Sequence, residues 1–203
     1  MKPKHALLGL FVVCNFCMSS SQAATFNWDS NNTAAPVAFD GAGIWTNANN
    51  FHNGTANITW PTGTAVTDIA AFGNTASVPI GLPGSVTFTT AISAGGLNFN
   101  PYVGTAARYT ITGGAGGTLQ LNGTPVINMN THQVRPFARI DAILAGTAGF
   151  NVASSTSGIL EIGSQANTIT GGIRLQTGSS LSIGADAGLG GTGNSLTFSG
   201  TST

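Results

Sequence analysis

The sequence contains very little charge. Asp, Glu, Lys and Arg together make up 6 % of its 203 residues, and six basic residues balance six acidic ones. About a quarter of the residues of an average soluble domain are charged. Because no basic excess is available to neutralise phosphates, we expect no nucleic-acid partner. Charge-driven disorder is also excluded, since 41 % of the residues are hydrophobic and can form a core.

Long hydrophobic runs are confined to the start of the chain. Lys2 and Lys4 precede an apolar stretch at residues 6–18, and small residues follow up to Ala23. This order is typical of a secretory signal peptide. We therefore predict a signal peptide at residues 1–23 and a mature protein that is secreted or held at the cell surface. The stretch is shorter than the roughly 20 residues that span a bilayer, so we predict no transmembrane segment in the mature chain.

Cysteine is almost absent, and both cysteines, Cys14 and Cys17, lie within the predicted signal peptide. The mature chain would therefore contain neither a disulfide nor a thiolate metal site. His52 and His132 have no partner at metal-ligand spacing, and we interpret both as exposed loop residues. We accordingly expect no metal and no cofactor.

Helical periodicity is missing too, because Gly, Pro, Asn and Asp interrupt every stretch that could propagate a helix. All three tryptophans, Trp28, Trp45 and Trp60, lie in the segment 24–84. We interpret this segment as a β-rich cap that covers the apolar end of a solenoid. In the alternative interpretation the three rings form an exposed platform for stacking sugar rings.

Short β-prone segments separated by Gly, Ser, Thr and Asn make up the chain after residue 84. Most of them alternate apolar and polar residues, which places one face of each strand in a core. Triplets that begin with Leu recur along this region, and most of the steps between them are close to 21 residues or to twice that number. The triplets start at Leu97, Leu119, Leu160, Leu181 and Leu196. A period of this length indicates a solenoid. We therefore predict an all-β fold with a parallel β-helix repeat region at residues 85–203.

A solenoid also explains the missing charge. Equivalent residues of successive coils lie about 4.8 Å apart, so a charge that recurs in each coil becomes a column of like charges. Neutral Thr, Ser and Asn can instead form hydrogen bonds along the column. The 29 glycines suit corners where φ is positive or backbones approach closely.

Two parts of the sequence resemble the autotransporter-associated β-strand repeat proteins, which are large bacterial surface or secreted passengers. An aromatic pattern near the start and a later order of inner strand, Asn-Thr corner, Gly-Gly turn and closing strand carry the resemblance. These residues are Trp28, Trp45, Asn50, Phe51, Trp60, Pro61 and residues 71–73, then 140–150, 158–162, 167–172 and 178–185. The resemblance implies a right-handed parallel β-helix and a structural role at the cell surface. Because no barrel and no polar cap follow, we expect an N-terminal portion, truncated at its C-terminus.

The candidate chemistry is sparse. Asp141 and Glu161 are separated by 20 residues, about one coil, so stacking could bring the two carboxylates together. Arg135, Arg139 and Asp141 form the only concentration of charge, which we interpret as a solvated face with a local ion pair. Residues 188–193 match G-x-G-x-x-G, but a strand-like segment follows instead of a helix, so we expect a turn.

We therefore assign no catalytic, cofactor-binding or metal-binding residues and expect a non-enzymatic passenger that contributes to adhesion. Its expected partners are surface glycans or proteins of a host or of the environment, together with further β-helix coils or a translocator. The alternative is a carbohydrate-binding module or a polysaccharide-active enzyme on a β-helix scaffold.

Overall fold

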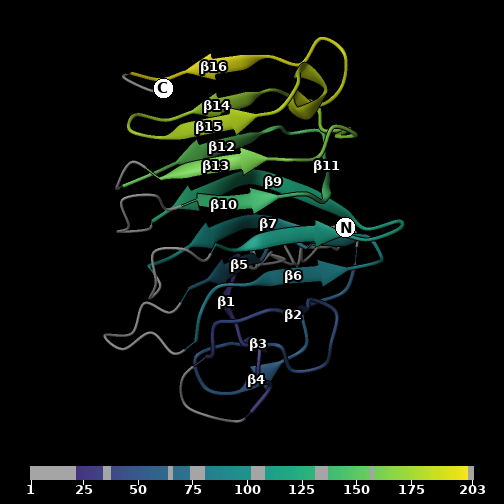
Figure 1. Ribbon diagram of the computed structural model, residues 1–203, viewed down its shortest axis with the longest axis vertical. Helices are drawn as coiled ribbons and strands as arrows, with labels where there is room; N and C mark the ends of the chain where they lie inside the picture. The colour runs from purple at the N-terminus through teal and green to yellow at the C-terminus, as the bar shows by residue number, and fades with distance from the viewer. Residues whose placement is uncertain are drawn as a thin grey trace, which may run out of the picture.

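Two long sheets give the molecule the form of a parallel β-solenoid. The computed structural model describes residues 22–33, 38–63, 66–73, 81–101, 108–130, 137–155 and 158–200. One sheet has ten strands and the other six, and the chain passes from one to the other in each coil. The strands stack along the long axis, from β3 and β4 at one end to β16 at the other (Figure 1). The all-β solenoid predicted from the sequence is confirmed.

Most of the strands have four residues or fewer, as the frequent Gly, Pro and Asn residues predict, and only β7 and β9 are longer in the part of the chain that the structure describes. The ten-stranded sheet contains β1 (Thr25–Trp28), β3 (Phe51–His52), β4 (Asn57–Ile58), β5 (Ile69–Phe72), β7 (Ile92–Phe99), β9 (Thr118–Met129), β11 (Ile143–Ala145), β12 (Phe150–Ala153), β14 (Ile173–Leu175) and β16 (Leu196–Phe198). The six-stranded sheet contains β2 (Gly43–Ile44), β6 (Ser85–Phe88), β8 (Thr110–Gly113), β10 (Phe137–Ile140), β13 (Ile159–Ile162) and β15 (Ser180–Ile183). One 3₁₀ helix, η1 (Asp186–Leu189), precedes the last strand.

Strands of successive coils pair in parallel. In the six-stranded sheet the outward column contains, in register order, Ser85, Thr110, Arg139, Glu161 and Ser182. The antiparallel pairs, β1 with β3 and β3 with β4, are confined to the N-terminal end. Most of the described chain therefore places each residue directly beside its counterparts in the neighbouring coils.

Each middle coil contributes two consecutive segments to the ten-stranded sheet. The start of β9, at Thr118, Leu119 and Gln120, pairs with β11, whereas its later residues from Val126 pair with β12. A register irregularity between Ala94 and Gly96 of β7 marks the same bend. Together with the strand in the six-stranded sheet, each of these coils has three segments.

The predicted equivalence of the five Leu triplets is wrong for most of them. Leu97 pairs with Ile127 on one side of the bend, whereas Leu119 pairs with Ile92 on the other. Leu160 and Leu181 are register partners, 21 residues apart, as predicted. Because each coil contains more than one apolar strand, spacings between different segments imitate a repeat.

Inward side chains form one continuous core along the solenoid. Phe72 of β5 and Phe99 of β7 stack with ring centroids 5.4 Å apart and an interplanar angle of 20°. Near the N-terminal end, Trp45 packs against both Phe51 and Trp60, with centroid distances of 5.4 and 5.3 Å. Such pairs contribute about 0.5–1.5 kcal/mol each beyond the burial of their area. The aromatic segment at the start of the chain is thus packed onto the first coils.

Neutral polar side chains form hydrogen bonds between coils, as the low charge predicts. On the outer wall, Asn128 donates from Nδ2 to Oδ1 of its register partner Asn98 at 2.7 Å. At a corner, the buried Asn167 side chain accepts from the backbone N–H of Leu144 at 2.8 Å and donates to the carbonyl of Gly188 at 2.8 Å. Asn167 therefore ties together backbone of three successive coils.

Backbone contact at the corners explains part of the glycine content. Gly149, just before β12, has a φ of +67°, and a Cβ at this position would lie 1.9 Å from the carbonyl oxygen of Gly172. Gly193 has a similar φ of +83°, but its Cβ would meet nothing within 4 Å. The first glycine is required by space and backbone conformation, and the second by conformation alone.

These two glycines form a matched pair for testing the corner. We expect Gly193→Ala to lower the free energy of unfolding by about 1–2 kcal/mol, the cost of a left-handed Ala. Gly149→Ala should cost at least about 2 kcal/mol more, because coils must also separate. Urea unfolding measures both values. Equal losses in the two variants would contradict the close contact between Gly149 and Gly172.

Candidate functional site

Stacking brings Asp141 and Glu161 to the same face, as their spacing allows, but arginines pair with both carboxylates. Arg139 donates from Nε to Asp141 Oδ1 at 2.6 Å and from Nη1 to Glu161 Oε1. Arg108 donates from Nη1 to Glu161 Oε2 at 2.6 Å. The hydrogen bond to Asp141 is the main cause that raises the pKa of Arg139. The four side chains form an ion-pair network with both carboxylates neutralised. Arg135 lies outside the described residues.

The acidic side chains near the N-terminal end accept hydrogen bonds from the protein itself, mostly from backbone N–H groups. Asp29, which is fully buried, accepts from the N–H of Phe39 at 3.1 Å and from Asn57 Nδ2 at 2.9 Å. Asp68 accepts from the N–H of Ala24 at 2.9 Å. These carboxylates join loops that lie far apart in the sequence, and each has protein donors in place of water.

Asp40 and Tyr109 form a buried pair. The Tyr109 hydroxyl donates to Asp40 Oδ1, which also accepts from the backbone N–H of Gly73 at 3.1 Å. The exposed fractions of Asp40 and Tyr109 are 4 % and 1 %. Burial, followed by the Asp40 carboxylate, raises the pKa of Tyr109 far above its ordinary value. The pair fastens the loop before β2 to the coil that enters β8.

The histidine prediction is wrong for His52. This residue is buried in β3 with 5 % of its surface exposed, and its Nδ1 accepts from the backbone N–H of Gly54 at 3.1 Å. The N–H of Gly54 in the following turn satisfies the buried imidazole, and this hydrogen bond cannot be inferred from the spacing of residues in the sequence. His132, Cys14 and Cys17 lie outside the described residues. Within the described part of the chain, no three His, Cys, Asp or Glu side chains gather as a metal site.

The three tryptophans do not form an exposed platform. Trp28, Trp45 and Trp60 are 1 %, 0 % and 5 % exposed. Trp28 Nε1 donates to the carbonyl of Gly41 at 2.9 Å, and Trp60 Nε1 to that of Ser93 at 3.0 Å. The cavity beside Trp45 and Trp60 has a volume of about 120 Å³, well below the roughly 300 Å³ of a small ligand pocket. These rings act as core.

The G-x-G-x-x-G segment at residues 188–193 leads into a strand, as predicted. Gly188 is the buried residue of η1, Gly190 has a φ of +105°, and β16 follows. The Asn194 side chain donates from Nδ2 to the carbonyl of Leu189 at 2.6 Å and accepts from the N–H of Gly172 at 2.5 Å. The glycines therefore form a corner of the solenoid.

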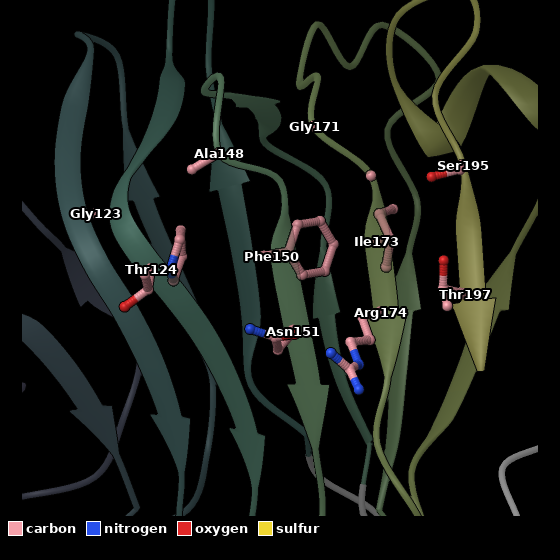
Figure 2. A pocket seen from close by; sticks show the side chains of 12 residues that line it. Gly123, Thr124, Ala148, Phe150, Asn151, Gly171, Ile173, Arg174, Ser195 and Thr197 are labelled. Atoms are coloured by element: carbon pink, nitrogen blue, oxygen red, sulfur yellow. The ribbon is translucent and has the colours of Figure 1, made fainter. Parts of the chain in front are cut away.

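A pocket that the sequence did not indicate lies on the ten-stranded sheet. We call it the Arg174 pocket. Its volume is about 340 Å³, and it crosses β9, β12, β14 and β16 beside the glycine corners (Figure 2). Its lining residues are Gly123, Thr124, Pro125, Ala148, Phe150, Asn151, Gly171, Gly172, Ile173, Arg174, Ser195 and Thr197. The volume is within the range of about 300–1,000 Å³ that is usual for small-molecule sites.

Register explains how the polar side chains of this pocket come together. Asn151 of β12 faces Arg174 of β14, and Arg174 faces Thr197 of β16. Figure 2 shows the three side chains on consecutive strands, beside the ring of Phe150. The arrangement offers amide, guanidinium and hydroxyl groups in one row, about 4.8 Å from strand to strand. It can bind polar groups and contains no carboxylate for acid–base catalysis.

Comparisons with known proteins identify one similar sequence. The chain is 31 % identical over 196 residues to an adhesin, the BmaC autotransporter of Brucella suis biovar 1 (strain 1330), and the match covers 94 % of this chain. The chain spans 5 % of the length of that relative. No family model matches the chain, and no solved structure matches it. The similarity supports a passenger-like protein of the autotransporter type. Within the described residues, no helix has the length and hydropathy of a membrane span.

The burial of Trp45 leads to a prediction that distinguishes a core residue from a residue of an exposed sugar-binding platform. Trp45→Ala is expected to lower the free energy of unfolding by about 3–5 kcal/mol, because a fully buried ring leaves a cavity. The adjacent exposed Thr46→Ala should change it by less than about 0.5 kcal/mol. Urea unfolding followed by fluorescence measures both. A Trp45→Ala protein of unchanged stability would contradict the core assignment.

The Asp40–Tyr109 pair predicts a loss of stability at high pH. Unfolded Tyr109 ionises near its ordinary pKa of about 10, whereas the folded residue has a raised pKa and stays protonated. The contribution is complete below pH 10 and is lost above it, at about 1.4 kcal/mol per pH unit. Few other groups titrate in this window, because the only lysines of the sequence are Lys2 and Lys4 and the only other tyrosine is Tyr102.

Urea unfolding between pH 8 and pH 11 tests this dependence. Tyr109→Phe should be less stable at pH 8 by about 1–3 kcal/mol, because Asp40 loses a donor, and should lose less stability from pH 10 to pH 11 than the unsubstituted chain. An identical slope in the two proteins would show that Tyr109 does not cause it.

Proposed function

We propose that the mature chain is an exported, non-catalytic segment of a surface passenger of the autotransporter-associated β-strand repeat type, and that it contributes to adhesion. The observation that carries the proposal is a parallel solenoid whose sequence is similar, along nearly its whole length, to a segment of an autotransporter adhesin. Adhesion belongs to the name of that relative and is part of the proposal for this chain.

The domain organisation is part of the same proposal. A signal peptide at residues 1–23 directs export, residues 24–84 cap the solenoid, and residues 85–203 form its repeat region. Backbone ladders give such a segment a rigid, extended surface without disulfides. Its partners are surface glycans or proteins, together with further coils or a translocator.

The use of the acids supports a non-catalytic role. Asp29, Asp40 and Asp68 bind backbone or side-chain donors, and Asp141 and Glu161 face arginines. A glycoside hydrolase needs two carboxylates free to act on either side of the scissile bond. In the described chain, only Asp186, which is exposed, stands outside these arrangements.

Export and attachment test the proposal directly. Expressed with its own N-terminus in a Gram-negative host, the chain should leave the cytoplasm and begin at Ala24. Beads coated with the purified mature chain should attach to cell surfaces more than beads coated with the same chain after heat denaturation. Retention in the cytoplasm, or equal attachment of folded and denatured chain, would contradict the proposal.

The enzymatic alternative has its own control in the same preparation. The purified chain is expected to release no reducing ends from acidic polysaccharides, and Asp141→Asn and Glu161→Gln should leave attachment unchanged. A release of sugar that disappears in either variant would favour the enzyme instead.

A further inference from the structure

The three arginines that the structure describes differ in their partners. Arg108 and Arg139 pair with carboxylates, whereas Arg174 has none within 4.0 Å among the described residues. On the six-stranded sheet, two charges of opposite sign, Arg139 and Glu161, are register partners. On the ten-stranded sheet, the column of Arg174 is otherwise neutral: Val126, Asn151 and Thr197. Arg174 is thus a positive charge without compensation on a nearly uncharged wall.

The guanidinium of Arg174 is oriented. Its Nε donates to Ser199 Oγ at 2.5 Å, which fixes the direction of the planar group. Its two Nη atoms have no hydrogen bond or ion pair within the described chain. Two parallel N–H groups in a fixed plane match the geometry of a carboxylate or a sulfate.

The surroundings of Arg174 suit hydroxyl groups. Asn151 and Thr197 lie one strand to either side, and the side chain of Asn151 has no hydrogen bond within the described residues. Gly171 and Gly172 expose backbone at the rim of the pocket. Neutral donors and acceptors on both sides of one cation are complementary to a ligand that has many hydroxyls and an occasional negative charge.

Other polymers fit the same place less well. A peptide strand binds by adding to an open sheet edge, whereas the Arg174 pocket lies on the face of the sheet. Three of its four strands, β9, β12 and β14, are paired on both sides, and only β16 has an open edge. A nucleic acid requires several cations to neutralise its phosphates. The pocket contains one cation and several neutral polar groups.

We infer that the Arg174 pocket binds an anionic glycan. A carboxylate or sulfate of the sugar pairs with the Nη atoms of Arg174, and hydroxyls of the same or the next sugar bind Asn151 and Thr197. The inference rests on the proposed function, because it names the ligand class of the adhesive surface. It concerns a different event, since binding in solution requires neither export nor surface display.

Calorimetric titration of the purified mature chain tests the inference. Oligogalacturonate is the carboxylate probe, sulfated dextran oligosaccharide the sulfate probe, and neutral dextran oligosaccharide the uncharged control. At least one anionic probe should bind and neutral dextran should not. Arg174→Gln is expected to weaken that binding at least about tenfold, and Asn151→Ala about threefold. Arg174→Lys should bind more tightly than Arg174→Gln but less tightly than the unsubstituted chain, because Lys has the positive charge but lacks the two parallel N–H groups of the guanidinium.

Two controls keep the result specific. Gln165→Glu makes the same change in net charge as Arg174→Gln at an exposed position outside the pocket, and it should leave affinity unchanged. Thermal unfolding should be the same for Arg174→Gln and the unsubstituted chain, since Arg174 is exposed. Polyglutamate should compete poorly.

Four outcomes would overturn the inference: no binding of either anionic probe, equal binding of neutral dextran, equal losses with Gln165→Glu and Arg174→Gln, or equal competition by polyglutamate. Glycan binding by a chain that is not exported would leave the inference standing and remove the proposed function. Attachment of coated beads without binding of either anionic probe would do the reverse.

Discussion

Backbone hydrogen bonding between successive coils is the constraint from which the other features follow. It places each outward side chain about 4.8 Å from its counterparts on both sides, so the chemistry of a residue is that of its column. Neutral residues can bond along such a column, as Asn98 and Asn128 do. Neighbouring charges are tolerated when their signs are opposite, as for Arg139 and Glu161. The low charge of the sequence and the location of its few ion pairs therefore have the same cause.

The class of fold was predictable because apolar alternation, glycine content and missing charge are properties that every coil repeats. The alignment of one coil on the next was not. Leu97 and Leu119 lie in the same sheet on opposite sides of a bend, and their separation reflects the path within a coil. Leu160 and Leu181 align as predicted because they occupy the same segment of successive coils. A spacing in the sequence predicts which residues stack only when both residues occupy the same segment of their coils.

The same limit applies to the polar residues. The spacing of Asp141 and Glu161 allowed the two carboxylates to approach each other, but it did not indicate that Arg108, 53 residues before Glu161, lies beside them. The burial of His52 depends on the N–H of Gly54 two residues later, which composition does not reveal. Arg174 stands out only when the partners of every other described arginine are known. The absence of a carboxylate partner is what distinguishes Arg174, and only the three-dimensional structure shows this absence.

The Asp40–Tyr109 contact has a mechanical consequence. Hydrogen bonds between coils run along the long axis, so tension on the two ends loads them in series and peels the solenoid one layer at a time. Asp40 forms hydrogen bonds beyond its own coil, with Gly73 and Tyr109. These bonds connect the coils that a pull on the N-terminal end would separate first. Force applied at that end therefore meets several layers at once.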